Sequence, residues 1–372
     1  MTNAALRRTL DAYLTRIVEV GASDFHLSSE CLPLARLHGG LVSIGDHVIS
    51  GDDVSQFARL LLDENDWLTL SERKNIDFSY ETTLAGMQRR FRCNVYMQNL
   101  GLSIVMRAIP LQIPRWDECG LPPSVIDLTR FSQGLVLVTG ATSCGKSTTL
   151  AALLRHINEN RPLHVITIED PIEYVYTCEK ALIHQRQVGM DVDSFQGALR
   201  AALREDPDVI LIGELRDLET TQLAITAAET GHLVLGTMHT NSAAKTIDRI
   251  IDAFPVDQQP QIRLMVSESL RGIIAQQLVP RLDGQGRVMA CELLHVIPSI
   301  SHMIRDGRTF QITGVLQTHA NLGMCSMDQA LANLYLQGVI SENECRGRSL
   351  DQTLLDTLLN EGSPHQGLSR KK

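Results

Sequence analysis

The first third of the chain combines two helical patterns with short alternating segments. Apolar residues recur at helical spacing over residues 4–20, which predicts an amphipathic helix. A second helix is expected over residues 54–61. Strand patterns cover residues 24–27, 34–37, 41–44, 77–80, 90–96 and 102–107, with a hairpin turn at His38–Gly40. Phe91, Cys93 and Val95 alternate with polar residues, so one sheet face should be buried and the other polar and basic. We expect a small α+β domain with an antiparallel sheet.

The pattern changes to unbroken apolar runs separated by helical patterns. The runs are Leu135–Val138, Val165–Ile168, Val209–Ile212 and Leu233–Leu235. One helical pattern holds Ile247, Ile250, Ile251 and Phe254, and another holds Ile262, Met265, Val266, Ile273 and Ile274. Strands that are apolar on both faces are typical of a parallel sheet covered by helices on both sides. The fold class is therefore α/β in this region.

Four prolines between Pro110 and Pro123 interrupt all periodicity and indicate a linker, with the boundary near residue 112. We expect an N-terminal domain over residues 1–111, with the linker at its end, and an α/β core over 112–298. Short helices should follow over 299–361, and the polar segment 362–372 should be disordered.

Composition argues against several classes of function, although a local basic groove remains open. Among 372 residues, 34 Lys and Arg against 43 Asp and Glu give a net charge of −9, which argues against a broad nucleic-acid surface. The eight cysteines include no Cys-x-x-Cys pair, which argues against a zinc ribbon or a redox motif. No apolar run approaches the roughly 20 residues of a membrane span. We expect a cytoplasmic protein that reaches a membrane only through partners.

A phosphate-binding loop follows the first apolar run. Gly140–Ser147 has the form Gly-x-x-x-x-Gly-Lys-Ser, and apolar residues at helical spacing begin after Thr148. Backbone N–H groups and the start of the helix should hold phosphates, with Lys146 on the β- and γ-phosphates and Ser147 on Mg²⁺. The expected ATP-binding residues are Gly140, Ala141, Thr142, Ser143, Cys144, Gly145, Lys146, Ser147 and Thr148. The core is then a RecA-like P-loop NTPase fold.

Carboxylates and a histidine follow the other apolar runs. Glu169, Asp170 and Glu173 come after one run, where a solvated acidic loop is the alternative interpretation. Glu214 follows another run in the position of a Walker-B acid, although it could simply begin the next helix. His239 follows the run beside the P-loop strand and could donate to a γ-phosphate, whereas His232 lies at the opposite strand end.

Four segments, in chain order, resemble the Walker A, Asp box, Walker B and His box of secretion ATPases. They are Gly140–Ser147, Ile168–Tyr174, Ala201–Glu214 and Ala227–Thr240. Ser242–Pro255 and Gly323–Leu331 further resemble the type IV pilus retraction ATPases of the PilT/PilU family. The resemblance extends over residues 21–343.

This resemblance implies a PAS-like N-terminal domain before the RecA-like core, assembled as a homo-hexamer. It implies that Mg²⁺ and ATP serve a motor that retracts a pilus at the cytoplasmic face of the inner membrane. The expected partners are a membrane platform protein and a paralogous retraction ATPase. Glu173 would be the general base, Glu214 the Walker-B acid and a Mg²⁺ ligand, and His239 a γ-phosphate contact. Arg92 and Arg107 would close over the nucleotide.

The chain departs from the family pattern at two places. Ser143-Cys144 replaces Gly-Ser in the loop, where glycine would supply positive φ, and the Cys144 thiol beside Lys146 is expected to have thiolate character. Ser299–Asp306 replaces a retraction motif, yet its Ile300, Met303 and Ile304 share one face, which predicts partner binding. Two other functions stay open: an ATPase of a type II or type IV secretion apparatus, and a weakly catalytic regulator of a paralogous ring.

Overall fold

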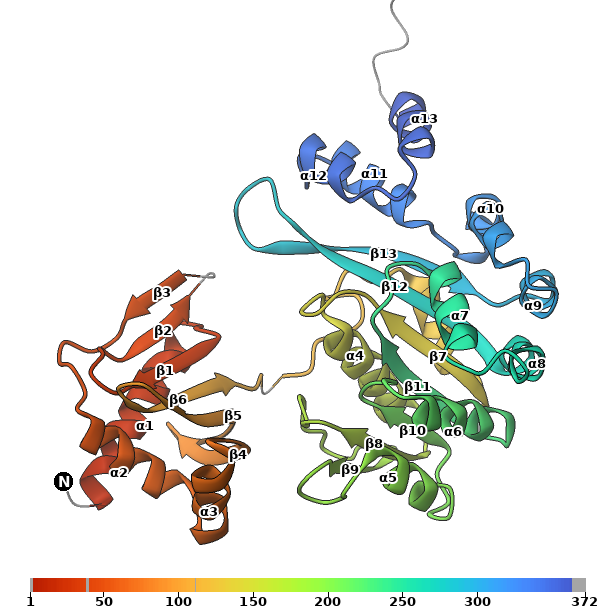
Figure 1. The fold of residues 1–372 in the computed structure, drawn as a ribbon. Helices are drawn as coiled ribbons and strands as arrows, with labels where there is room; N and C mark the ends of the chain where they lie inside the picture. The colour runs from red at the N-terminus through yellow and green to blue at the C-terminus, as the bar shows by residue number, and fades with distance from the viewer. Residues whose placement is uncertain (1–2, 38–39, 111, 363–372) are drawn as a thin grey trace, which may run out of the picture. The chain divides into compact units, whose positions relative to one another are not determined.

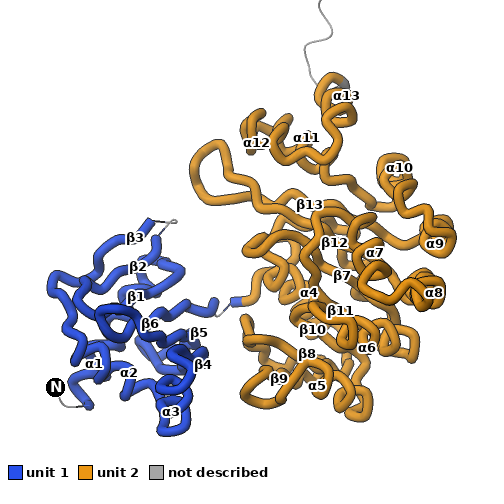
Figure 2. Tube along the Cα trace, viewed as in Figure 1, with its two compact units in different colours: residues 1–112 blue, residues 113–372 orange. Residues whose placement is uncertain are grey.

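The computed structural model describes residues 3–37, 40–110 and 112–362. Two compact units divide the chain, residues 1–112 and residues 113–372 (Figure 2). The predicted turn at His38 and Gly39 lies outside the described residues, as does the segment predicted to be disordered, 362–372, except Gly362, which is the last residue of a helix. Separating residues 299–361 from the core stays a prediction.

Unit 1 is built on a six-stranded antiparallel sheet with the order β3-β2-β1-β6-β5-β4 (Figure 1). Its elements are α1 (Asn3–Glu19), β1 (Asp24–Ser28), β2 (Leu34–Leu37), β3 (Gly40–Ser43), α2 (Gly51–Leu61), α3 (Glu64–Arg73), β4 (Asn75–Leu84), β5 (Met87–Gln98) and β6 (Gly101–Ala108). Phe91, Cys93 and Val95 are fully buried in a cluster with the apolar stripe of α1. The predicted antiparallel sheet with one buried face is confirmed. Helix α3 was not predicted. Leu70 is its only buried residue, so the helix has no apolar stripe that the sequence would reveal.

Unit 2 is built on a seven-stranded sheet with the order β13-β12-β7-β11-β10-β8-β9. All neighbouring strands run parallel except β12 and β13. The strands are β7 (Gly134–Thr139), β8 (His164–Glu169), β9 (Leu182–Gln187), β10 (Val209–Ile212), β11 (Leu233–Met238), β12 (Leu270–Pro280) and β13 (Arg287–His295). The predicted parallel-rich α/β fold is therefore confirmed.

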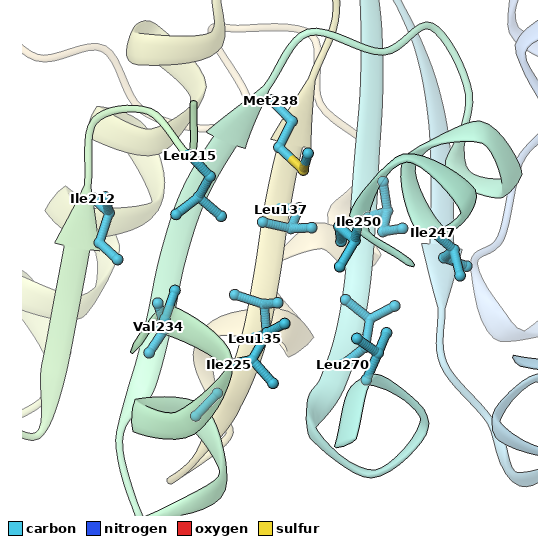
Figure 3. Close-up of a cluster of buried hydrophobic side chains, with 14 of the residues drawn as sticks. Leu135, Leu137, Ile212, Leu215, Ile225, Val234, Met238, Ile247, Ile250 and Leu270 are labelled. Carbon is cyan, nitrogen blue, oxygen red and sulfur yellow. The ribbon is translucent and has the colours of Figure 1, made fainter. Parts of the chain in front are cut away.

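Helices on both faces bury this sheet, and successive residues of each strand enter different cores. Leu135 and Leu137 pack with α5 (Phe195–Ala202), α6 (Leu218–Glu229), α7 (Ala243–Asp252) and α8 (Gln259–Ser269). Figure 3 draws these two leucines together with Ile225 of α6 and Ile250 of α7. Val136 and Val138 pack with α4 (Lys146–Asn160) and the 3₁₀ helix η1 (Pro123–Thr129). Burial on both faces explains why these strands read as unbroken apolar runs.

One predicted helix is wrong at its end. Helix α8 stops at Ser269, and Ile273 and Ile274 belong to strand β12 instead. Both isoleucines are fully buried because the strand is covered on its two faces, and their spacing continues the helical pattern only by coincidence. The long hairpin formed by β12 and β13 therefore escaped prediction.

Short helices follow the hairpin, as predicted. They are α9 (Pro298–Arg305), η2 (Thr309–Gln311), α10 (Ile312–Thr318), η3 (Ala320–Leu322), α11 (Met327–Leu336), α12 (Glu342–Arg348) and α13 (Gln352–Gly362). The prediction that Ile300, Met303 and Ile304 form a partner-binding face is wrong. Ile300 and Ile304 are fully buried in the core of unit 2, and Met303 packs against it.

A buried carboxylate joins the hairpin to two helices. Glu292 on β13 is 4% exposed. Its Oε1 accepts from Ala243 N at 2.6 Å, and its Oε2 accepts from Met327 N at 3.3 Å. These N–H groups begin α7 and α11, whose first turns need acceptors. Burial raises the pKa of Glu292, although the two N–H groups oppose the shift.

Replacing Glu292 with alanine should lower the free energy of unfolding of unit 2 by about 2–4 kcal/mol, because two buried N–H groups lose their acceptor. Hydrogen exchange should accelerate at Ala243 and Met327, and the thermal midpoint should fall. Glu342→Ala on the exposed surface of α12 is the matched control. Unchanged exchange at both amides would contradict this role.

Candidate nucleotide-binding site

The P-loop joins β7 to α4 and depends on glycine at both ends. Gly140 has a φ of 147° and Gly145 a φ of 91°. A Cβ atom at Gly140 would lie 2.4 Å from the Gln276 carbonyl oxygen and 2.5 Å from Cys144 Sγ. Both distances are shorter than real contacts allow, so only glycine fits at Gly140.

Ser143 occupies the left-handed region with a φ of 61°. Left-handed backbone costs a non-glycine residue about 1–2 kcal/mol. Ser143, which differs from the family pattern, thus lies at a position where glycine would adopt the same backbone conformation without this cost. Contacts elsewhere in the loop must hold this conformation.

The first N–H groups of α4 have no partners within the helix. Glycine at the N-cap, Gly145, brings no side-chain oxygen to them. By contrast, α5, α6 and α7 are capped by the side chains of Ser194, Asp217 and Ser242. Helix α4 thus begins with donors suited to an anion.

Lys146 stands in the first turn of α4 and folds back along the loop. Its Nζ donates to the carbonyl oxygens of Gly140 and Ala141, both at 3.0 Å. The ammonium charge therefore lies beside the residues that precede it in the loop. A cation in this position complements phosphate.

Glu214 lies just beyond the carboxyl end of β10 and contacts two basic side chains. Its Oε2 lies 2.7 Å from a terminal nitrogen of Arg216, and its Oε1 lies 3.1 Å from Nε2 of His239. Burial alone would raise the pKa of Glu214, but Arg216, His239 and Lys146 outweigh it and lower the pKa. The carboxylate is therefore ionised at neutral pH. It does not begin α6, which starts at Leu218 with Asp217 as its cap.

His239 directly follows β11, the neighbour of the P-loop strand. Met238 pairs with Thr139 in the parallel ladder, and Gly140 N donates to Met238 O at 3.3 Å. The predicted placement of His239 at this strand end is confirmed. His232 lies at the opposite end, where its Nδ1 is 3.0 Å from Ala227 O.

The Asp box follows β8 at the same edge of the sheet. Glu173 is exposed, while Glu169 accepts from Thr167 Oγ1, Gln185 Nε2 and Glu173 N. Burial raises the pKa of Glu169 despite these donors. The hydroxyls of Tyr174 and Thr148 share a hydrogen bond of 3.0 Å, which fixes this loop to α4.

Arg92 and Arg107 belong to unit 1, where they are direct cross-strand partners on β5 and β6. The Nε of Arg107 donates to Asp24 Oδ1 at 2.8 Å, and the Arg107 side chain remains 62% exposed. The Asp24 pKa is lowered, because the donors Ser23 and Arg107 outweigh its burial. As direct cross-strand partners, the two arginines belong to the same face of this sheet.

The expectation of thiolate character at Cys144 is wrong. The residue is 5% exposed, and burial raises the pKa of its thiol even though Lys146 and nearby N–H groups favour the anion. Closeness to lysine in sequence could not reveal that the thiol points into the protein.

Sequence reasoning missed three residues that support this site. Arg216 pairs with Glu214, Tyr174 bonds to Thr148, and Gln276 contacts the P-loop from β12. Arg216 is two residues after Glu214, so a charge pattern could have found it. Gln276 was not identified because Ile273 and Ile274, in the same strand, were assigned to a helix.

Comparison with known proteins assigns this chain to a protein family. The model of the family described as "Type II/IV secretion system protein" matches residues 2–344. The chain belongs to this family. The resemblance to secretion ATPases is therefore confirmed for most of the chain.

Among members of this family, the type IV pilus retraction ATPase PilT of Pseudomonas aeruginosa is 43% identical over 329 residues, which cover 88% of this chain and 94% of PilT. A twitching motility protein of Neisseria gonorrhoeae is 43% identical over 319 residues, covering 86% and 84% of the two chains. A crystal structure of the pilus retraction motor PilT with bound ADP has a TM-score of 0.87 and 42% identity, covering 93% of this chain and 98% of that one.

Proposed function

We propose that the chain is a hexameric motor that hydrolyses Mg²⁺-ATP to drive pilus retraction by pilin depolymerisation. The observation that carries the proposal is the grouping of Lys146, Glu214 and His239 at the carboxyl edge of one parallel sheet. Ligands of open α/β sheets bind at this edge. The similarity to retraction ATPases supports the choice of motor over other NTPases.

Residues of the chain divide the work. Bound ATP supplies the phosphoanhydride bond whose hydrolysis releases energy. The P-loop residues 140–148 bind its phosphates, and Lys146 places its charge among them. Glu173, exposed beside the site, is proposed to take the proton of the attacking water. His239 is proposed to contact the γ-phosphate, and its Nε2 also lies 3.1 Å from Glu214 Oε1.

Magnesium fits the donors that are present. Ser147 offers a hydroxyl in the first turn of α4, and Glu214 offers an ionised carboxylate. Hard oxygen donors of this kind suit Mg²⁺, which keeps several waters and phosphate oxygens in its shell. We propose that Ser147 and Glu214 hold the ion, Glu214 through its charge.

Assembly and location complete the proposal. We propose a homo-hexamer in which Arg92 and Arg107 close over the nucleotide. Its proposed partners are an inner-membrane platform protein and a paralogous retraction ATPase. No helix within the described ranges has the length and apolar character needed to cross a bilayer. We therefore propose that partners hold the motor at the cytoplasmic face of the inner membrane.

Deleting the gene should leave cells with surface pili that they cannot retract. Complementation with the intact gene should restore retraction. A gene that encodes the Glu173→Gln variant should not, because that variant lacks the general base. The measurement is retraction of labelled pili in single cells. A strain that loses its pili, or that retracts normally, would contradict the proposal.

A second candidate function is a nucleotide-binding regulator of a paralogous ring. The left-handed Ser143 in the P-loop favours it, because glycine would be conformationally better there. Turnover of ATP by the purified chain alone would exclude this function.

A further inference from the structure

Gln276 reaches the P-loop from the adjacent strand β12. It is 1% exposed, and its two partners, Cys144 and Thr149, are 5% and 0% exposed. Gln276 Nε2 donates to Cys144 O at 2.7 Å, and Gln276 Oε1 accepts from Thr149 Oγ1 at 2.9 Å. One buried amide therefore joins the loop to the first turns of α4.

The chemistry of the partners allows only one orientation of this amide. A carbonyl oxygen cannot donate, so the atom that faces Cys144 O must be the amide nitrogen. The oxygen of the amide must then face Thr149, whose hydroxyl donates to it. Gln276 is fixed in position and direction before any ligand arrives.

The bond to Cys144 O sets the direction of the next N–H group. In a trans peptide, the C=O and the N–H point in opposite directions. Since Cys144 O points at the Gln276 side chain, the N–H of Gly145 points away from that side chain. Gly145 is the N-cap of α4, so this N–H belongs to the group of donors that the P-loop offers to an anion.

Close packing leaves the loop little room to adopt another conformation against Gln276. The Gln276 carbonyl oxygen fills the space where a Cβ of Gly140 would lie, at 2.4 Å. Its Nε2 lies 3.3 Å from the corresponding point at Gly145. Both glycines of the motif therefore pack directly against this one residue.

We propose that Gln276 is a positioning residue that orients the Cys144–Gly145 peptide for binding of nucleotide phosphates. The inference rests on the proposed function, because it assumes that the P-loop binds ATP and ADP. It assigns to β12 a role in nucleotide affinity, in addition to its place in the sheet.

Gln276→Met keeps the volume of the side chain and removes both hydrogen bonds. We expect the Kd for a fluorescent ADP analogue to rise roughly tenfold, the effect of losing one well-placed charge-assisted hydrogen bond. Gln277→Met, at the next position of the same strand, is the matched control and should bind like the intact chain.

The double variant Gln276→Met/Thr149→Val separates positioning from stability. It removes the unpartnered Thr149 hydroxyl, so the thermal midpoint should recover toward that of the intact chain. Affinity should stay weak, because Cys144 O still lacks its donor. If the single variant does not fold, the double variant carries the affinity measurement.

Alkylation of Cys144 gives a readout independent of nucleotide. Loosening the loop should raise the labelling rate of Cys144 several-fold, while the buried Cys345 in α12 serves as internal reference. Intact affinity in Gln276→Met, or recovery of affinity in the double variant, would overturn the inference. Failure of the intact chain to bind ADP would instead overturn the proposed function.

Discussion

Replacing Lys146 with alanine is expected to abolish ATP hydrolysis, with turnover falling at least about a thousandfold. The ammonium group lies beside the carbonyls of Gly140 and Ala141, inside the loop that is proposed to hold the phosphates. Negative charge on the transferring phosphoryl group is stabilised by fixed positive charge, and alanine leaves none at this position. Phosphate release by the purified chain at saturating ATP measures the effect.

Lys180→Ala is the matched control, since Lys180 is exposed in the segment before β9. Its turnover should equal that of the intact chain. Unfolding curves for both variants should coincide with the original, because neither side chain is part of a core. If the Lys146→Ala variant hydrolyses ATP at the original rate, the proposed role of the P-loop in hydrolysis is contradicted.

The second large effect is expected from Glu214→Gln, which preserves shape and removes charge. We expect the kcat for ATP to fall about a hundredfold to a thousandfold, with a smaller change in KM. The ionised carboxylate is held between Arg216 and His239, and glutamine would leave both basic groups without their counter-charge. A second substitution, His239→Ala, should then add less than it does alone, because the two residues act together.

Glu219→Gln on α6 provides the comparison for Glu214. Glu219 is exposed and pairs with Arg200 on the surface, where such ion pairs contribute about 0–1 kcal/mol. Its kcat should not change. Equal kcat values for the Glu214 and Glu219 variants would show that Glu214 has no special role in hydrolysis.

Much of the fold could be predicted because burial leaves a clear pattern in sequence. The strands that carry the site are covered on both faces, so Leu135–Val138 and Val209–Ile212 appear as unbroken apolar runs. The same burial led to a wrong prediction at Ile273 and Ile274. These strand residues continue the helical spacing of α8 and were therefore assigned to that helix. Strand β9 was missed because only its first two residues are apolar and four polar residues follow them at the edge of the sheet.

The candidate site was only partly predictable for a different reason. Lys146, Glu214 and His239 follow strands, and parallel strands bring their ends together at one edge. The conformation of Ser143, the burial of Cys144 and the bonds of Gln276 depend on what packs against the loop. Such contacts join residues more than a hundred positions apart, and local sequence patterns carry no record of them.

The hairpin of β12 and β13 makes hydrogen bonds both to the P-loop and to helix α11 in the C-terminal region. Gln276 pairs with Cys291 across the ladder, and the neighbouring rung pairs Ala275 with Glu292. Gln276 bonds to the phosphate loop on one face, while Glu292 bonds to the starts of α7 and α11 on the other. Two neighbouring rungs of one hairpin thus carry hydrogen bonds to the phosphate loop and to the starts of α7 and α11. The chain therefore needs only these few residues to connect its nucleotide loop to a helix, α11, that lies nearly 200 positions further along the sequence.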